Sequence, residues 1–152
     1  DRDNRKDIIG GLWVVPVKGL RIGAFGWTGS RAAVGEKNRY AFSGEYAKDD
    51  WTFRTEYIHS QGWNSGFTSD KADGIYALCI APVQNNKFHV KARYDLYREA
   101  KEWGRSKTLY EVGADYVFTN NLQVNLEYAR VNDRTAANHD YNMVDLELDF
   151  RF

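Results

Sequence analysis

Several residue types that signal particular protein classes are scarce in this 152-residue chain. The single cysteine, Cys79, cannot form a disulfide within the chain, and no cysteine or histidine spacing resembles a zinc site. The longest uncharged apolar runs, residues 8–17 and 74–83, fall short of the ~18 to 20 residues that a membrane-spanning helix needs. The 21 basic and 21 acidic residues cancel, which argues against a general nucleic-acid binder. These absences exclude a disulfide scaffold, a zinc domain and a helical membrane protein.

Aromatic residues, in contrast, make up 15% of the chain, and they take part in an alternating pattern that is clearest at its end. From residue 144 to residue 152 the odd positions carry only charged side chains, and the even positions carry only apolar ones. The apolar set is Val144, Leu146, Leu148, Phe150 and Phe152. A period of two places the sets on opposite faces of a β-strand, whereas a helix would mix them around its circumference.

The same alternation predicts five further strands, within residues 40–46, 51–57, 88–96, 110–118 and 122–128. Residues 8–15, 20–28 and 74–82 are apolar or small on both parities and bring the count to nine. Residues 98–103 have helical propensity but follow a strand pattern, so we expect them to continue that strand into a loop. Short turns at residues 16–19, 48–50, 85–87 and 120–121 alternate with longer polar links at 29–38, 62–73, 99–106 and 132–140. Alternating short and long connections predict an up-and-down antiparallel sheet.

The aromatic residues are sorted by height along the predicted strands. One group lies beside the short turns: Trp51, Phe53, Phe88 and Phe118, with Phe150 and Phe152 at the chain end. A second group lies near the long links: Tyr40, Tyr57, Tyr76, Tyr94, Tyr110 and Tyr128. Amphipathic rings suit the headgroup level of a membrane. The two groups therefore predict an all-β fold, namely a transmembrane up-and-down antiparallel β-barrel whose apolar parity faces lipid. The alternative is a soluble barrel whose apolar parity faces the inside.

The charged parity would then line the inside of the barrel. The candidate pore-lining residues are Arg39, Arg54, Lys91, Arg93, Glu56 and Asp95. On the six clean strands five basic residues face nine acidic ones, so this part of the wall does not favour anions. Arg54, Lys91 and Arg93 are candidates for a local basic ladder. The alternative is that they form ion pairs with Glu45, Glu56 or Asp95 across neighbouring strands.

The final segment resembles the C-terminal assembly signal of outer-membrane proteins, with Tyr141, Val144, Leu146, Leu148, Phe150 and Phe152 as the residues that the barrel-assembly machinery would read. More narrowly, residues 19–24, 51–57, 91–95, 113–116 and 132–134 resemble strand motifs in the C-terminal half of the phosphate-selective porin O and P family of Bacteroidetes. This resemblance implies a sixteen-stranded, often trimeric porin in the bacterial outer membrane. Such a porin passes small solutes or anions passively.

The position of the last predicted strand also bears on whether the nine strands form a whole barrel. Phe152 ends the last predicted strand on the short-turn side, which faces the periplasm in bacterial barrels, and nine strands then leave the first one starting outside the cell. We therefore expect residues 1–152 to be the C-terminal part of a single barrel domain, with a small complete barrel as the alternative. His59, His89 and His139 share no catalytic motif, so we expect no enzyme, no cofactor and no metal. A non-channel barrel that serves as a scaffold also remains open.

Overall fold

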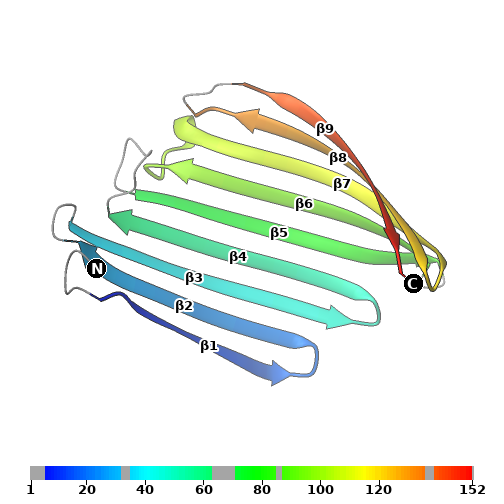
Figure 1. The fold of residues 1–152 in the computed structure, drawn as a ribbon, viewed down its shortest axis with the longest axis horizontal. Helices are drawn as coiled ribbons and strands as arrows, with labels where there is room; N and C mark the ends of the chain where they lie inside the picture. The colour runs from blue at the N-terminus through cyan, green and yellow to red at the C-terminus, as the bar shows by residue number, and fades with distance from the viewer. Residues whose placement is uncertain (1–5, 32–34, 63–70, 85–86, 136–138, 152) are drawn as a thin grey trace.

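The computed structural model describes residues 6–31, 35–62, 71–84, 87–135 and 139–151, which form a single β-sheet. Each strand is hydrogen-bonded to its neighbours in sequence, and every pairing is antiparallel (Figure 1). The strands are β1 (Ile8–Val17), β2 (Leu20–Arg31), β3 (Gly35–Lys48), β4 (Trp51–Gly62), β5 (Lys71–Gln84), β6 (Phe88–Glu99), β7 (Ser106–Thr119), β8 (Leu122–Asp133) and β9 (Tyr141–Phe150).

The prediction of an all-β, up-and-down sheet of nine strands is confirmed, and it includes the three strands whose alternation is less clean. The strands run further than the pattern indicated, because β7 already begins at Ser106 and β8 continues to Asp133. The expected continuation of β6 past Arg98 is correct as far as Glu99, and a short 3-10 helix, η1 (Trp103–Arg105), follows. Within the described part of the chain, no helix is long and apolar enough to cross a membrane.

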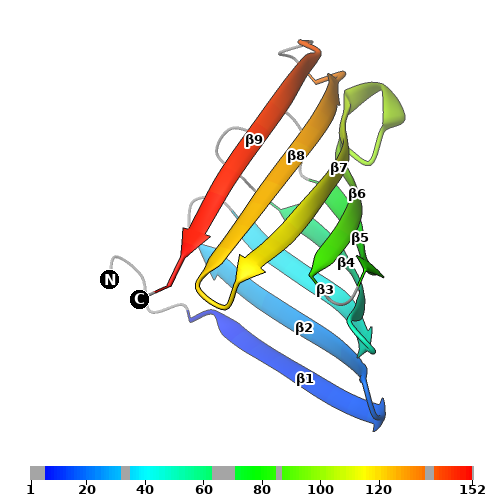
Figure 2. The ribbon, with the colours of Figure 1, turned by 90° about the vertical axis from the view of Figure 1, so that its right-hand side faces the viewer.

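The sheet is bent into a trough with a concave and a convex face. Figure 2 shows β1–β3 and β7–β9 as two limbs that extend to the same side from the strands between them. The outermost strands, β1 and β9, are the edges, and the described strands leave the sheet open between them. The curvature follows from the right-handed twist that neighbouring antiparallel strands accumulate.

The connections alternate less strictly than predicted. β2 reaches Arg31 and β3 begins at Gly35, so the long link expected at residues 29–38 is wrong, and most of those residues belong to strands. The turn between β3 and β4 is correct and consists of Asp49 and Asp50, both in the left-handed region with φ of 51° and 64°. Two left-handed residues match the twist of a tight hairpin. Residues 85–86 lie outside the described part of the chain.

Both prolines lie at interruptions of the strand pairing. Pro16 lies in the register shift between Val14 and Val17 of β1, which corrects its expected place in the turn. Pro82 flanks the shift that ends at Gln84 of β5. A third shift lies between Val117 and Thr119 of β7. Each shift adds one residue to the strand just before a short turn, and a bulge is where a residue without an N–H is tolerated within a sheet.

Candidate functional site

The strand register brings the apolar parity of all nine strands onto one face. Leu126 of β8 is paired with Ala114 of β7 and with Leu146 of β9, and Tyr94 of β6 is paired with Ala77 of β5. The facing predicted for the six clean strands is therefore confirmed, and the register now assigns β1, β2 and β5 as well. The members of this face on those three strands include Leu12, Val14, Ile22, Ala24, Ile75, Ala77 and Cys79.

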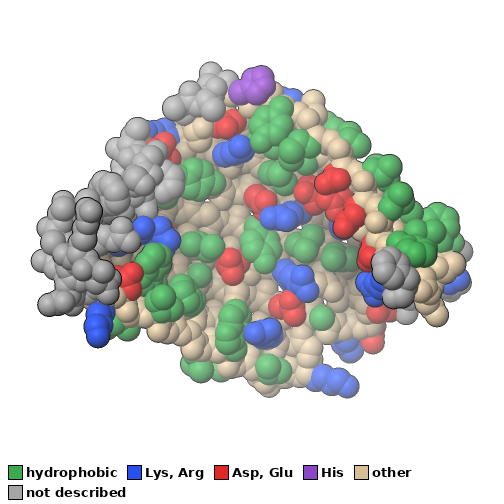
Figure 3. Space-filling view, in the orientation of Figure 1, with side chains coloured by type: hydrophobic (Ala, Val, Ile, Leu, Met, Phe, Trp, Pro, Cys, Tyr) green, Lys and Arg blue, Asp and Glu red, His purple; other side chains and the backbone are tan. Residues whose placement is uncertain are grey.

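The charged parity occupies the concave face, where side chains crowd together. Figure 3 looks onto this face and shows Lys, Arg, Asp and Glu side chains across its middle. The side chains of Lys91 and Glu127 are only 15% and 29% exposed. Val112 and Leu126 on the convex face are 58% and 53% exposed. The apolar side chains thus splay outward, and the charged ones point into the trough.

Almost no apolar side chain is buried. In the described ranges the only buried apolar residues are Ala72, Ala129 and Val131. A water-soluble sheet covers its apolar face with another layer, because exposed apolar surface of this extent is unfavourable in water. The convex face of this sheet has no such cover among the described residues. The apolar convex face must therefore be covered by something outside the sheet.

The convex face carries two rows of aromatic rings. The first row lies near the short turns and includes the stacked Trp51 and Phe53, with ring centroids 5.7 Å apart, and the pair Tyr116 and Phe118 at 4.7 Å. In the same row Phe88 lies 6.5 Å from Tyr116.

The second row lies near the longer connections. It contains the pairs Tyr40 and Tyr57 at 6.3 Å and Tyr94 and Tyr110 at 5.3 Å, and Tyr128 donates a hydrogen bond to Asn142. The expected place of Tyr76 in this row is wrong. Tyr76 is paired with Glu56 on the concave face, where Arg93 lies 5.4 Å from its ring centroid.

Between the two rows the convex face carries small or aliphatic side chains. A shallow groove of about 550 Å³ lies there, with Gly44, Thr55, Ala77, Cys79 and Ala92 along it. The hydroxyl of Thr55 donates to the backbone oxygen of Tyr76, so it is satisfied within the sheet. At Thr55 the groove therefore presents a methyl group rather than a free hydroxyl.

Beyond the tyrosine row the same parity becomes polar. Thr28 donates to Asn38 over 2.6 Å, and Arg98 forms a double hydrogen bond with the buried Asp73 over 2.9 and 2.6 Å. Arg130 contacts both Asn142 and Asp140. The apolar surface is thus a band of limited height, bounded by rings on both sides and followed by polar groups toward the longer connections.

The terminal strand contributes to this band. Of the predicted assembly-signal residues, Val144, Leu146, Leu148 and Phe150 are exposed on the convex face of β9. Tyr141 is paired with Val131 on the concave face, where Lys107 lies 5.4 Å from its ring centroid. Phe152 lies outside the described residues.

The six candidate pore-lining residues all lie on the concave face, and several of them form ion pairs. Arg54 contacts Glu45 directly across β3 and β4 at 2.6 Å. Arg93 contacts Asp95 on its own strand at 3.0 Å. The alternative to a basic ladder, an ion pair across neighbouring strands, is confirmed for Arg54. Arg93 has one of the expected partners, but the two residues lie on the same strand.

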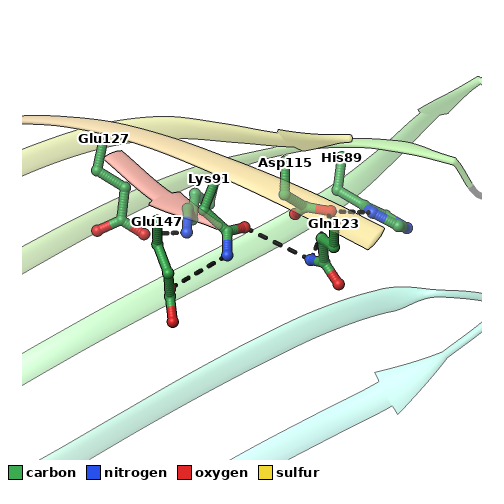
Figure 4. Close-up of polar contacts among 7 residues, drawn as sticks. His89, Lys91, Asp115, Gln123, Glu127 and Glu147 are labelled. Atoms are coloured by element: carbon green, nitrogen blue, oxygen red, sulfur yellow. Dashed lines mark hydrogen bonds and ion pairs between the residues drawn. The ribbon is translucent and has the colours of Figure 1, made fainter. Parts of the chain in front are cut away.

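Lys91 forms an ion pair that sequence reasoning missed. Its ammonium contacts Glu127, and the two residues belong to β6 and β8 with β7 between them (Figure 4). Gly113 of β7 is the residue that lies between them in the register. A Cβ on Gly113 would lie 2.9 Å from Lys91 Cε, from Glu127 Cγ and from the backbone oxygen of Leu126. The missing side chain therefore lets two charged side chains meet across an intervening strand.

A second polar chain runs beside this bridge, as Figure 4 shows. His89 Nδ1 lies 2.9 Å from Asp115 Oδ2, and Gln123 donates to the same oxygen over 3.3 Å. Gln123 also contacts Asn125, whose amide donates to Glu147 over 3.2 Å. The contacts link four adjacent strands, β6 to β9, on the concave face.

The opposite limb combines basic and aromatic side chains. The Arg21 guanidinium lies 4.3 Å from the Trp13 ring centroid, and that of Arg39 lies 4.6 Å from the Trp27 ring centroid. Lys37 Nζ lies 5.3 Å from the same Trp27 ring. The sequence does not predict these cation–π contacts, because Trp13, Arg21 and Trp27 lie in strands whose facing the alternation leaves open.

Asp133, at the end of β8 beyond the apolar band, anchors the connection to β9. The Thr135 hydroxyl and backbone N–H both donate to this carboxylate, and Lys107 Nζ lies 3.6 Å away. The hydrogen bond from the Thr135 hydroxyl, helped by the backbone N–H and by Lys107, lowers the pKa of Asp133 below its usual value.

No family model matches the sequence, and no curated protein matches it. In the described part of the chain, no group of three or more His, Cys, Asp or Glu side chains is arranged to hold a metal ion. The resemblance to phosphate-selective porins therefore stays a prediction.

Proposed function

We propose that this chain forms part of the wall of an outer-membrane β-barrel pore, through which small solutes or ions diffuse passively. The observation that carries the proposal is the bounded apolar band on the convex face, opposite a concave face of charged side chains. In such a barrel the band meets lipid, the rings mark the two headgroup regions, and the charges face an aqueous channel.

The height of the band agrees with this proposal. Tyr110 and Phe118 lie on one strand in the two rows of rings, eight residues apart in the sequence. At ~3.4 Å per residue and a tilt of ~45° they span roughly 19 Å along the membrane normal, near the ~25 Å expected for an outer-membrane barrel. Partial insertion of the rings into the headgroups accounts for the remainder.

A closed wall needs more strands than the nine described here. The outer edges of β1 and β9 pair with no other described strand, and in hydrocarbon the backbone groups of such edges must be satisfied by further pairing. We propose that additional antiparallel strands complete the barrel, up to the sixteen implied by the resemblance. The same resemblance suggests a trimer in the bacterial outer membrane, inserted by the barrel-assembly machinery that reads β9.

A soluble ligand-binding barrel is the main competitor, and the direction of curvature disfavours it. In such a barrel the apolar parity points into the concave side and encloses the ligand. Here Leu126 and Leu146 point to the convex side, and Lys91 and Glu127 point to the concave side. A measurement of conductance is needed to distinguish a non-channel barrel from a porin, because both would have the same lipid-facing surface.

The first test is conductance of the protein in a planar lipid bilayer. Stepwise openings support a pore, and a correctly inserted protein without openings supports the non-channel scaffold. A protein that remains in solution without detergent contradicts both membrane proposals.

A pair of variants tests the orientation of the faces. Leu126→Arg places a charge in the apolar band and should cost about 2–4 kcal/mol of unfolding free energy in lipid. Asn125→Arg makes the same charge change one residue away on the concave face and should cost less than about 1 kcal/mol, because water and Glu147 are within reach. Equal costs for the two variants would refute the assignment of the convex face to lipid.

A further inference from the structure

The concave face is electrically unequal between its two limbs. β7–β9 place one basic residue, Lys107, on this face, together with seven acidic residues: Glu111, Asp115, Glu127, Asp133, Asp145, Glu147 and Asp149. Among the residues whose side chains the structure describes, β1–β3 place three basic residues on it, Arg21, Lys37 and Arg39, and one acidic residue, Glu45. The formal charges are therefore about −6 and +2, by summing these residues. Asp and Glu gather toward one side of the face in Figure 3.

The basic side chains of the intervening β6 do not compensate this excess. Lys91 is engaged by Glu127, Arg93 by Asp95, and His89 contacts Asp115. In each of these contacts the β6 side chain is paired with an acidic residue of β6, β7 or β8, so it does not neutralise a carboxylate of β9. Two carboxylates of β9 are left to be balanced by mobile ions.

Asp145 and Glu147 are the two carboxylates in question. Asp145 is paired in register with Glu127, which Lys91 already contacts. Glu147 accepts a hydrogen bond from the neutral amide of Asn125. Both are exposed, and no described Lys or Arg forms an ion pair with either. Asp149, by comparison, contacts Arg151 at 3.2 Å.

We propose that Asp145 and Glu147 bias permeation toward cations, an inference that rests on the proposed pore function. Their charges raise the local concentration of cations along the β7–β9 limb and lower that of anions. The effect acts over a Debye length of ~10 Å at 0.1 M salt and requires no fixed ion site. The β1–β3 limb, with its arginines over Trp13 and Trp27, is where anions are tolerated.

The test is the reversal potential of single channels in a potassium chloride gradient across a bilayer of uncharged lipid. We expect the wild-type protein to prefer potassium over chloride. The double variant Asp145→Asn/Glu147→Gln should lower the ratio of potassium to chloride permeability by roughly two- to threefold. The matched control Asp49→Asn/Asp50→Asn removes the same two charges from a turn, and asparagine tolerates its left-handed backbone. This control should leave the ratio unchanged.

The outcomes separate the selectivity from the pore itself. Absence of any channel from correctly inserted wild-type protein refutes the pore proposal. Channels that prefer chloride, or a permeability ratio that the β9 double variant does not lower, overturn the cation bias and leave the pore intact. A control that shifts the ratio as much as the β9 variant also overturns it, because total charge would then decide selectivity. Far-UV circular dichroism of each variant verifies that its strands have formed.

Discussion

Replacement of Gly113 by alanine should destabilise the sheet, although alanine is normally the better strand residue. Where the backbone accepts it, Gly→Ala stabilises a protein by ~0.4–1 kcal/mol through the unfolded chain. At Gly113 the new methyl group would lie 2.9 Å from Lys91 Cε, Glu127 Cγ and the backbone oxygen of Leu126. The side chains can rotate away only by lengthening their ion pair, and the backbone oxygen cannot move without disturbing the strand pairing.

The magnitude follows from two costs that oppose the gain. Overpacking costs ~1–3 kcal/mol, and a weakened charge-assisted contact between Lys91 and Glu127 adds to it. We therefore expect Gly113→Ala to lower the free energy of unfolding by about 1–2 kcal/mol. Gly26→Ala is the control, because Gly26 also lies in a strand and a Cβ there would meet nothing within 4 Å.

The assay is urea unfolding in detergent micelles or liposomes, followed by tryptophan fluorescence. Gly26→Ala should be neutral or slightly stabilising, while Gly113→Ala unfolds at lower urea. If the two variants unfold at the same urea concentration, or if Gly113→Ala is the more stable, the bridge across β7 does not depend on the missing side chain and the reasoning is refuted.

Two further predictions concern charged pairs. A double-mutant cycle with Lys91→Met and Glu127→Gln should give a coupling of about 1–2 kcal/mol, and the same cycle at the more exposed pair Arg54 and Glu45 at most about 0.5 kcal/mol; equal couplings would contradict the shielding of the concave face. Because its pKa is lowered on folding, Asp133 contributes stability that is present above about pH 4 and is lost as the pH falls through the lower folded value. Unfolding free energies at pH 5 and pH 3 should therefore differ less in Asp133→Asn than in the wild type, and an unchanged difference would refute this.

The alternation of side chains is sufficient to predict the nine strands and the facing of six of them. Val144, Leu146 and Leu148 could be assigned to one face from β9 alone, because the period of two leaves no other arrangement. The ends of the strands were harder. Ser106 begins β7 on the convex face, where the side chains are polar, and Asp133 ends β8 on the concave face. The apolar alternation therefore stops before the backbone hydrogen bonding of the strands does.

The charged contacts could be predicted only in part. Arg54 and Glu45 are direct neighbours in a tight hairpin, so the turn between β3 and β4 fixes their pairing. Lys91 and Glu127 are 36 residues apart and belong to strands that are not neighbours. Their contact depends on the register of two hairpins and on a glycine between them, and neither is visible in a local pattern. The sequence pattern places Tyr76 on the wrong face, because β5 is apolar on both parities and the alternation does not distinguish its two faces.

The three bulges described above determine where the chain length can change. One residue inserted or deleted in the middle of a strand would turn every following side chain to the opposite face, so that charges would enter the apolar band. A bulge absorbs an odd residue without this inversion. Because the bulges of β1, β5 and β7 all lie beside short turns, we expect related proteins to gain or lose single residues at that rim, and the strand segments between the two rows of rings to keep a constant length.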